Sequence, residues 1–530
     1  MGVKRTLMTL PAPIAAMANA AFYPDRPAAV ALVQTHISYV FLAGDDVYKV
    51  KKPVRFSFLD FSTLALRHHF CHEEVRLNRR LAPGVYHGVV AICREDQSYR
   101  LGREDDPNAV EFAVHMERLP DERILARLLD RNEATLQMID RIAAHMAEFH
   151  RHADAGPEVT ANGNRDAIRR VLEDNFSGVR PFRDLTLPAA DDDVIQAFCS
   201  TFLDREASLF SQRQANRRIR DCHGDLHAEH IVVDDRIVIF DCIEFNPRFR
   251  YCDVASEIAF LAMDLDHRGH PELSARLITE YARLAEDVDL RQLVPFYQCY
   301  RAYVRGKVDS LKSAEPEVEP AERAAARLSA RRHFALAYRY TWAYRPCLVV
   351  IVGLSGSGKS TVAIALHERT GFAHFNSDVI RKELAGLPPD ARAGAQYGVD
   401  LYTPERSAQT YQTMLARAEA ELAAGRGAIV DATFLHRSNR DSVRDIASTH
   451  KMPFLFVECC CPAEIVRQRL DERVRADIGP SDADWQIYLE QRQRYEPFAP
   501  EEASDRLVID TTGPRDRLLS VIEQALRERT

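Results

Sequence analysis

The sequence of 530 residues lacks the cysteine pattern of a disulfide framework or of a zinc site. Its 11 cysteines are scattered, odd in number and nowhere spaced as a CxxC pair. Such usage is typical of reduced thiols in a cytosolic protein, because disulfides persist mainly in oxidising compartments. We therefore expect a cytoplasmic protein whose cysteines form no disulfide framework.

Long apolar runs are also absent. No stretch approaches the ~18 consecutive apolar residues that a membrane-spanning helix requires. The first residues, MGVKRT, match a myristoylation pattern, and MTLPAPIAAMANA after Lys4 and Arg5 loosely resembles a signal peptide. Because Pro11 and Pro13 interrupt that stretch, we interpret neither pattern as a targeting signal and expect no membrane partner.

A basic excess is missing as well. The formal net charge of −8 and the pI of 6.2 argue against a protein that coats nucleic acid, although a local basic groove is compatible with them. Small anionic ligands fit these totals better. There is no internal repeat or low-complexity tract, and the length predicts two or three compact units of roughly 100–200 residues each.

The pattern of apolar residues changes near residue 345. Before that point, β-branched and aromatic residues flank the turn signal AGDD in residues 33–52, a further strand is predicted at 109–120, and helices then dominate. After it, strands and helices alternate to the end, which is typical of an α/β domain. We therefore predict an α+β domain over residues 1–344 and an α/β domain over residues 345–530.

The segment GLSGSGKST satisfies the phosphate-binding pattern G-x-x-x-x-G-K-[ST] between a predicted strand and a predicted helix. In this pattern backbone N–H groups surround the phosphates, the lysine reaches the β and γ phosphates, and the hydroxyl holds Mg²⁺. We expect Lys359 to act in catalysis as well, and Ser360 to be a metal ligand. The predicted nucleotide-binding residues are Gly353, Ser355, Gly356, Ser357, Gly358, Lys359, Ser360 and Thr361.

Two carboxylates follow predicted strands in the second domain. Asp378 lies in GFAHFNSDVIRKELAG, with Arg381 and Lys382 one helical turn later, and Asp431 ends the strand of GAIVDATFLHRSNR. Asp378 could cap the helix that follows it. Asp431 could bind metal in the manner of a Walker B carboxylate, or contact the substrate.

This half of the chain resembles the P-loop small-molecule and polynucleotide kinases, including the zeta-toxin and gluconate-kinase relatives. The resemblance implies that Asp378 accepts the proton of the substrate hydroxyl and that Arg381 holds a substrate phosphate or carboxylate. It also implies a lid arginine that neutralises transition-state charge, for which Arg469 and Arg473 in EIVRQRLDERVR are the candidates. The other arginines of that segment are interpreted as a solvated helix face.

Acidic and imidazole side chains surround two short apolar strands in CHGDLHAEHIVVDDRIVIFDCIEF, residues 222–245. Phosphoryl transfer without a P-loop requires a lysine for the nucleotide phosphates, a carboxylate base and side chains that hold Mg²⁺. The motif HGDLH, with FDCIEF one hairpin later, resembles the aminoglycoside phosphotransferase and choline-kinase family, whose fold is that of the protein kinases. The resemblance implies that Asp225 is the catalytic base and that Asp241 is a metal ligand.

The same resemblance assigns roles further upstream. The hairpin VFLAGDDVYKVKK supplies a nucleotide-binding lysine, for which we choose Lys49 and keep Lys51 in reserve. Glu74 in CHEEVRLNRRLA is the carboxylate expected to pair with this lysine, and Glu73 is the alternative. The segment MERLP at 116–120 would link the two lobes and contact the adenine ring.

His230 departs from the family pattern HGDxHxxN, in which Asn supplies a second Mg²⁺ ligand through its carbonyl oxygen. An imidazole is a poor replacement, because Mg²⁺ prefers oxygen donors. The lobe could be a pseudokinase, Glu229 or Glu244 could supply the missing oxygen, or His230 could coordinate a softer ion such as Mn²⁺. A purely structural acidic turn without nucleotide is the remaining alternative.

Together the motifs resemble those of bacterial bifunctional proteins that join an aminoglycoside-phosphotransferase-like domain to a P-loop kinase-like AAA-type ATPase domain. The resemblance implies a protein-kinase-like, two-lobed fold followed by a P-loop fold whose parallel sheet is flanked by helices. It implies an ATP-dependent phosphotransferase that uses ATP and Mg²⁺, with the chemistry mainly in the P-loop domain and the first domain a second kinase or a pseudokinase regulator.

The acceptor expected from this resemblance is a small molecule with a hydroxyl group. Acidic residues around Asp225 would tolerate a cationic or polyhydroxyl acceptor, whereas Arg381 and Lys382 would favour an anionic one in the second domain. One alternative function is an ATP-gated regulatory module with slow hydrolysis. Another is a nucleic-acid 5′-end kinase, for which a few basic clusters give the only electrostatic support.

Overall fold

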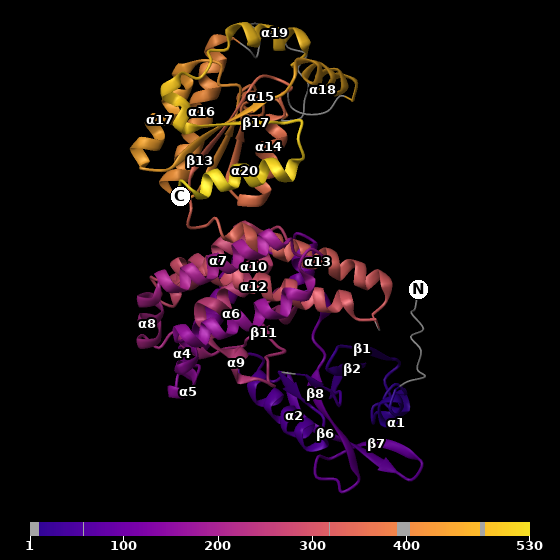
Figure 1. Cartoon of the computed structure of the whole chain (residues 1–530). Coiled ribbons are helices and arrows are strands. Elements are labelled where there is room, and N and C mark those ends of the chain that lie inside the picture. Colours follow the sequence, from indigo (N-terminus) through magenta and orange to yellow (C-terminus); the bar gives the residue numbers. More distant parts are fainter. Residues whose placement is uncertain (1–9, 57, 317, 389–402, 477–482) are drawn as a thin grey trace. The chain divides into compact units, whose positions relative to one another are not determined.

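The computed structural model describes residues 10–56, 58–316, 318–388, 403–476 and 483–530 (Figure 1). Residues 1–9, which carry the MGVKRT pattern, lie outside the described part of the chain. A membrane-crossing helix, which must be both long and apolar, is not found among the helices that the structure describes.

The chain divides into two compact units, Met1–Ala337 and Tyr338–Thr530, which we call unit 1 and unit 2. The division falls inside helix α13 (Pro320–Tyr340). The boundary predicted from the sequence, at residues 344 and 345, lies in the connection from α13 to strand β13 (Leu348–Val352).

Unit 1 begins with a six-stranded antiparallel sheet in the order β1-β2-β3-β8-β6-β7. Its second and third strands form the hairpin predicted around AGDD, where Gly44 has a φ of +68°, a conformation that glycine adopts without a Cβ clash. The strands of the sheet are β1 (Val30–Gln34), β2 (Ser38–Ala43), β3 (Asp46–Lys51), β6 (Tyr86–Glu95), β7 (Ser98–Gly102) and β8 (Ala109–Glu117). A separate small hairpin is formed by β4 (Arg55–Phe56) and β5 (Leu59–Asp60).

Alternation along β3 gives the two faces of the sheet different partners. Val47 packs into a core with residues of helix α2 (Leu64–Asn78), while the opposite face packs against α1 (Ala12–Ala16) and the residues after it. Successive side chains of a strand point to opposite faces. Lys49 and Lys51 therefore lie on the same side of the sheet as α2.

The remainder of unit 1 is a helical lobe around α10 (Val254–His267) (Figure 1). Every residue from 254 to 265 is buried, as expected for a helix that is surrounded by other elements on all sides. The other helices are α3 (Leu125–Asp130), α4 (Leu136–His152), α5 (Pro157–Thr160), α6 (Arg165–Val179), α7 (Ala189–Arg205), α8 (Ala207–Ala215), α9 (Pro247–Arg250), α11 (Pro271–Leu284), α12 (Leu290–Ala314) and α13.

Two short strand pairs hold the acidic motif of unit 1. They are β9 (Ile219–Asp221) with β12 (Tyr251–Asp253), and β10 (Ile231–Val233) with β11 (Ile237–Ile239). HGDLH lies between β9 and β10, and FDCIEF begins directly after β11. The motif residues are thus brought together at one end of the β10–β11 hairpin.

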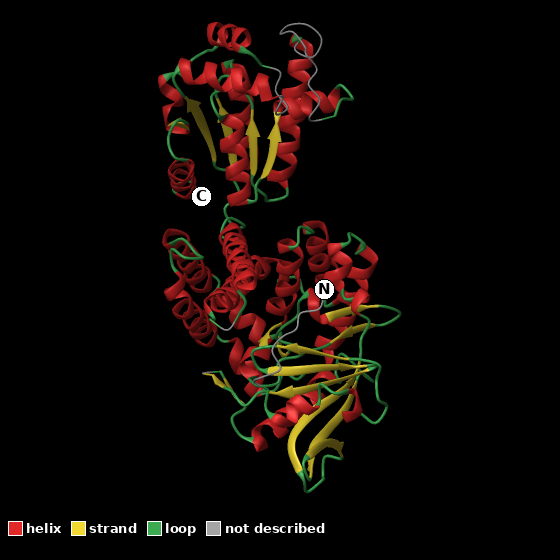
Figure 2. Cartoon of the chain, turned by 90° about the vertical axis from the view of Figure 1, so that its right-hand side faces the viewer, coloured by secondary structure: helices red, strands yellow, loops and turns green. Residues whose placement is uncertain are grey.

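Unit 2 is a five-stranded parallel sheet in the order β14-β15-β13-β16-β17, with helices on both sides (Figure 2). The central strand β13 is buried at every residue, which explains its uninterrupted apolar sequence LVVIV. The other strands are β14 (Ala373–Asn376), β15 (Ala428–Asp431), β16 (Phe454–Cys460) and β17 (Arg506–Asp510). The helices are α14 (Lys359–Thr370), α15 (Ser377–Leu384), α16 (Pro404–Ala423), α17 (Arg437–His450), α18 (Ala463–Ala476), α19 (Trp485–Arg494) and α20 (Arg515–Arg527).

These two architectures confirm the predicted fold classes. The antiparallel sheet and helical lobe of unit 1 are α+β, and the parallel sheet with flanking helices in unit 2 is α/β.

Candidate functional site

A buried network of lysines and carboxylates connects β3 to α2 in unit 1. Lys49 Nζ lies 2.9 Å from Glu74 Oε1 and 2.5 Å from Asp241 Oδ1, while Lys51 Nζ lies 2.7 Å from Glu74 Oε2 and also contacts Glu244. Burial would lower the pKa of Lys49, but Asp241 and Glu74 raise it well above its ordinary value. Glu74 is fully buried and bridges the two lysines, so it fixes the position of both ammonium groups.

The two lysines and the two candidate glutamates differ in their surroundings. Lys49 is the lysine that reaches Asp241, and its side chain is 13% exposed, whereas that of Lys51 is 0% exposed. Glu73 points away from this network and forms an ion pair with Arg76. Of the two lysines, Lys49 is therefore the one whose ammonium group a ligand can approach.

The turn that carries Asp225 is held by Glu257 of α10. Glu257 accepts hydrogen bonds from the backbone N–H groups of His223, at 3.0 Å, and of Gly224, at 2.6 Å. Gly224 has a φ of +89°, and a Cβ at this position would lie 2.9 Å from the carbonyl oxygen of Phe249. Only glycine fits this turn without displacing its neighbours.

Asp225 has two imidazoles near its carboxylate. Its Oδ2 lies 3.5 Å from His227 Nε2 and 3.6 Å from His230 Nδ1. Burial would raise the pKa of Asp225, but His227 and His230 bring it well below its ordinary value. The carboxylate is therefore ionised near neutral pH and able to accept a proton.

His230 turns its two ring nitrogens to different partners. Nδ1 lies 3.0 Å from the carbonyl oxygen of Asp225, which can only accept a hydrogen bond, so Nδ1 carries the proton. Burial, and then repulsion by His227, lowers the pKa of His230 to about 4. The imidazole is therefore neutral near pH 7, and its Nε2 lone pair lies 3.5 Å from Asp241 Oδ2.

This donor set suits Mg²⁺ only in part. Asp241 offers the hard oxygen that Mg²⁺ prefers, but the adjacent ligand atom is the nitrogen of His230, which favours softer ions such as Mn²⁺. Glu229 and Glu244 already have cationic partners, Arg268 and Lys51 respectively.

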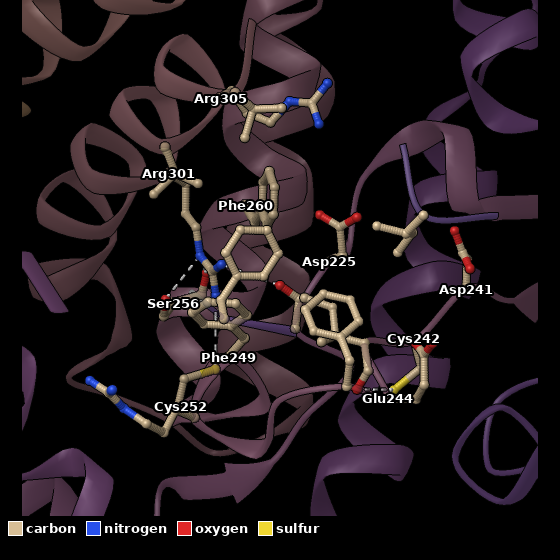
Figure 3. A pocket seen from close by; sticks show the side chains of 18 of the residues that line it. Asp225, Asp241, Cys242, Glu244, Phe249, Cys252, Ser256, Phe260, Arg301 and Arg305 are labelled. Carbon is tan, nitrogen blue, oxygen red and sulfur yellow. Dashed lines mark hydrogen bonds between the residues drawn. The ribbon is translucent and has the colours of Figure 1, made fainter. Parts of the chain in front are cut away.

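One cavity of about 1140 Å³ connects these groups (Figure 3). Lys49, Asp225 and Asp241 all line it, and so do Met116, Glu117 and Leu119 of the segment predicted to link the lobes. The volume exceeds the ~300–1,000 Å³ of ordinary small-molecule pockets. The cavity is therefore large enough for a nucleotide together with a small acceptor.

In unit 2 the P-loop follows β13 and begins α14. Gly353 has a φ of +144°, and a Cβ on it would lie 2.6 Å from the carbonyl oxygen of Cys459. Gly358, with a φ of +91°, occupies the position before the helix. Lys359 Nζ donates a hydrogen bond to the carbonyl oxygen of Leu354, at 3.0 Å, so the lysine folds over the loop.

The remaining P-loop positions form the same turn. Ser355 donates its backbone N–H to Gln491 Oε1 at 2.9 Å, and the carbonyl oxygen of Ser357 accepts a hydrogen bond from Thr511 Oγ1 at 2.6 Å. Gly356 has a φ of +78°, and Thr361 is exposed in the first turn of α14.

Asp431 lies beside the P-loop serine at the end of β15. Asn376 Nδ2 donates hydrogen bonds to Asp431 Oδ2, at 2.7 Å, and to Ser360 Oγ, at 3.4 Å. Asp431 Oδ1 is buried and has no hydrogen-bond partner within the described ranges of the chain. The serine hydroxyl and this carboxylate are hard oxygen donors, and their chemistry fits the Mg²⁺ of a P-loop site.

The alternative interpretation of Asp378, that it caps helix α15, is wrong. Asn376 Oδ1 accepts the backbone N–H groups of Asp378 and Val379, so the cap is Asn376. The carboxylate of Asp378 is instead paired with Arg381, with 2.5 Å between Oδ1 and Nη1. Asp378, in the first turn of α15, and Arg381, three residues later, thus form one ion pair.

Of the two lid candidates on α18, Arg469 contacts residues beside the P-loop. Arg469 donates hydrogen bonds to the hydroxyl and the carbonyl oxygen of Thr511, and a Cβ on Gly358 would lie 3.2 Å from its Nη1. Arg473 lies one turn further along α18 and is half-buried. Arg469 is therefore the arginine held beside the phosphate-binding loop.

Three cationic residues of α12 that line the unit 1 cavity were not predicted from the sequence. They are Arg301, Arg305 and Lys307. They belong to no motif, and the groups that Arg301 contacts, in Gly224, Cys252 and Ser256, are far from it in the chain. The only local signal is the spacing of Arg301 and Arg305 by four residues, which puts both on one helix face.

Comparison with known proteins gives one family match for each unit. Residues 43–293 match the phosphotransferase enzyme family, and residues 348–498 match an AAA domain. Uncharacterized proteins of Mycobacterium tuberculosis and Mycobacterium bovis are 29% identical to this chain over 487 residues, which are 91% of this chain and 93% of each relative.

Two solved structures are similar to parts of the chain. A choline/ethanolamine kinase family protein from Mesorhizobium loti is 15% identical, with a TM-score of 0.36, and the match covers 61% of this chain and 97% of that one. A gluconokinase from Sinorhizobium meliloti is 20% identical, with a TM-score of 0.26, and the match covers 35% of this chain and 93% of that one.

Replacing the two lysines of β3 separately is expected to separate nucleotide binding from folding. Lys51→Met leaves Glu74 and Glu244 buried with less cationic charge, which should lower the free energy of unfolding by about 3–5 kcal/mol. Lys49→Met should lower the affinity of unit 1 for a non-hydrolysable ATP analogue more than tenfold, with a smaller loss of stability. Calorimetric titration and chemical denaturation, both in a Lys359→Ala background, measure the two effects. The reverse pattern would assign the nucleotide to Lys51.

His230→Asn is expected to change the metal preference of unit 1. An amide oxygen in place of the imidazole should favour Mg²⁺, so the affinity for Mg²⁺ relative to Mn²⁺ should rise at least fivefold. Electron paramagnetic resonance of Mn²⁺, with Mg²⁺ as competitor, measures this ratio with the ATP analogue bound and Lys359→Ala present. His152→Asn, an exposed change elsewhere, is the matched control. An unchanged ratio in His230→Asn would mean that residue 230 does not contact the metal.

Proposed function

We propose that this chain, in which an APH-family phosphotransferase domain is followed by a P-loop AAA domain, is an ATP-dependent phosphotransferase acting on a small hydroxyl compound. The observation that carries the proposal is that Lys49, Asp241 and Asp225 line one cavity of about 1140 Å³ in unit 1. The sequence alone favoured the P-loop domain as the site of the chemistry. The assembled groups make unit 1 the first candidate for phosphoryl transfer.

Each residue of unit 1 has a part in the proposed reaction. Lys49, held by Glu74, binds the nucleotide phosphates at the wall of the cavity. The acceptor hydroxyl lies against Asp225 and attacks the γ-phosphorus, so that a bond forms from the acceptor oxygen to phosphorus and the bond to the β,γ-bridging oxygen breaks. The ionised Asp225 takes the hydroxyl proton, and ADP leaves.

A divalent ion would be held by Asp241, next to the His230 imidazole. When bound, it would neutralise part of the charge on the phosphates. Asp241 is the exposed end of the lysine–carboxylate network, with 41% of its side chain accessible, so it can exchange its contact with Lys49 for a ligand.

A second phosphotransferase site in unit 2 is favoured by the ion pair of Asp378 with Arg381. In this proposal Asp378 is the base, Arg381 contacts an anionic acceptor, and Lys359 and Arg469 contact the transferred phosphate. Ser360 and Asp431 would hold Mg²⁺, and Arg473 remains the alternative lid arginine.

Substitution of the two sites in turn should show which unit transfers phosphate. We expect Asp225→Asn to lower acceptor-dependent transfer from γ-labelled ATP by about 10²–10⁴-fold, the usual contribution of a general base. Lys359→Ala should leave that transfer largely intact. The assay uses the full chain with a mixture of small metabolites and measures label in the products.

Two other results would contradict the assignment to unit 1. Loss of transfer in Lys359→Ala alone would put the chemistry in unit 2. Slow hydrolysis of ATP with no labelled acceptor product in any variant would favour the ATP-gated regulatory module.

A further inference from the structure

Four basic side chains that line the unit 1 cavity form no ion pair in the part of the chain that the structure describes. They come from α6 and α12, which pack against each other. They are Arg170, Arg301, Arg305 and Lys307.

Arg301 is the most buried of these, with 7% of its surface exposed. It donates hydrogen bonds only to uncharged groups: the carbonyl oxygen and hydroxyl of Ser256, the carbonyl oxygen of Gly224 and the sulfur of Cys252. Its guanidinium also lies 4.8 Å from the centre of the Phe260 ring. Glu257 and Asp225 favour its charged form from beyond ion-pair distance, so an entering anion would supply the direct partner that a buried cation lacks.

Arg305 follows Arg301 by one helical turn on α12, and Lys307 follows Arg301 by six residues. Lys307 Nζ contacts the amide oxygen of Asn175, an uncharged group, and burial lowers its pKa. The acid that acts on its charge is the exposed Asp174, whose Oδ2 lies 3.7 Å from Arg248 Nη2. Arg305 is half-buried. In Figure 3, Asp225 lies between the two arginines, Arg301 and Arg305, and Asp241.

The acids that line the cavity each lie beside another basic side chain, and Asp225 acts on Arg301 and Arg305 only from beyond ion-pair distance. Asp253, for example, pairs with Arg213, and Glu315 with His36. The carboxylates that line the cavity and have such partners are Glu117, Asp121, Asp225, Asp241, Glu244, Asp253 and Glu315. The walls that α6 and α12 contribute to the cavity therefore carry basic side chains that no ion pair occupies within the described residues.

The walls near these cations are aromatic. Phe58, Phe245 and Phe249 form one cluster, with 6.0 Å between the ring centres of Phe58 and Phe245 and 6.2 Å between those of Phe58 and Phe249. The rings of Tyr300 and Phe260 both lie near the Arg301 guanidinium, with their centres 5.6 Å and 4.8 Å from it. Such walls suit a ligand with an apolar body and one charged group.

We propose that the acceptor of unit 1 is an anionic hydroxyl compound, whose carboxylate or phosphate group is bound by Arg305, Lys307 and Arg301 while its hydroxyl faces Asp225. The inference rests on the proposed function, because it takes the ligand at Asp225 to be the phosphate acceptor. Guanidinium groups bind carboxylates and phosphates through paired hydrogen bonds. This acceptor class replaces the cationic or polyhydroxyl acceptor that the acidic sequence around Asp225 suggested.

Binding of four compounds with the same phenol ring tests the inference. Meta-hydroxybenzoate carries a carboxylate, meta-hydroxyphenyl phosphate a phosphate, meta-hydroxybenzyl alcohol no charge and meta-hydroxybenzylamine a positive charge. Each is titrated calorimetrically into the full chain with both nucleotide sites filled by a non-hydrolysable ATP analogue. We expect at least one anion to bind tenfold or more tightly than the alcohol, and the amine to bind most weakly; the two anions distinguish a carboxylate from a phosphate ligand.

Variants of one helix locate the binding. Arg305→Glu should weaken binding of the preferred anion more than tenfold and strengthen that of the amine, while Arg305→Gln should weaken only the anion. Arg291→Gln, an exposed change on α12, is the matched control and should alter neither. Unfolding curves of the variants show whether each is folded.

Several results would overturn the inference. They are equal or tighter binding of the alcohol or the amine in the parent chain, absence of binding by both anions, and unchanged anion binding in Arg305→Glu. Failure of the proposed function gives another result. Anion binding would then depend on Arg305, but no phosphoryl transfer would depend on Asp225. In that case unit 1 would be an anion-binding unit and not a phosphotransferase.

Discussion

The bridging of Lys49 and Lys51 by Glu74 is the interaction on which the unit 1 site depends. Glu74 is fully buried, and a buried carboxylate is tolerated only when cations and hydrogen bonds surround it. Its two oxygens lie 2.9 Å from Lys49 Nζ and 2.7 Å from Lys51 Nζ. This bridge fixes α2 against β3, and it directs Lys49 toward Asp241 and the cavity. The position of Lys49, which we propose to bind nucleotide, is thus set by electrostatics in the interior.

The same network explains why the segment after β11 lies where it does. Asp241 contacts Lys49 and Glu244 contacts Lys51, so the FDCIEF segment is joined to the sheet through both lysines. Three carboxylates thus share two ammonium groups. One negative charge is in excess, and Asp241 is the most accessible of the three carboxylates, so we expect a divalent ion there. His230 lies beside Asp241, with 3.5 Å between its Nε2 and Asp241 Oδ2, and we propose that it influences which ion suits the position.

Much of the fold and of the site could be predicted from the sequence, because the informative residues are close together in the chain. The P-loop, the HGDLH turn and the AGDD hairpin are local patterns, and the family matches confirm the predicted pairing of the two domains. Alternation along β3 placed Lys49 and Lys51 on one face. It could not choose between them, because that choice depends on Asp241 and Glu244, about 190 residues away.

Non-local contacts also account for what sequence reasoning missed. The cap of α15 is Asn376, whose amide is positioned by Asp431 on a neighbouring strand. Arg301 and Arg305 lie in a helix with no recognisable motif, and their place in the cavity follows only from the contact of α12 with the Asp225 turn. The acidic sequence around Asp225 predicts a negative site, whereas the structure pairs some of those acids internally, Asp241 with Lys49 and Glu244 with Lys51. Net local composition is therefore a poor guide to the charge that a ligand meets.

The central claim is that unit 1 binds nucleotide through Lys49 independently of the P-loop. Its most direct test is the number of ATP-analogue molecules bound per chain, measured by equilibrium titration of the purified full-length protein. The account predicts two in the parent chain, one in Lys359→Ala and none when Lys359→Ala is combined with Lys49→Met. If Lys359→Ala alone bound none, unit 1 would have no nucleotide site and the account would be wrong.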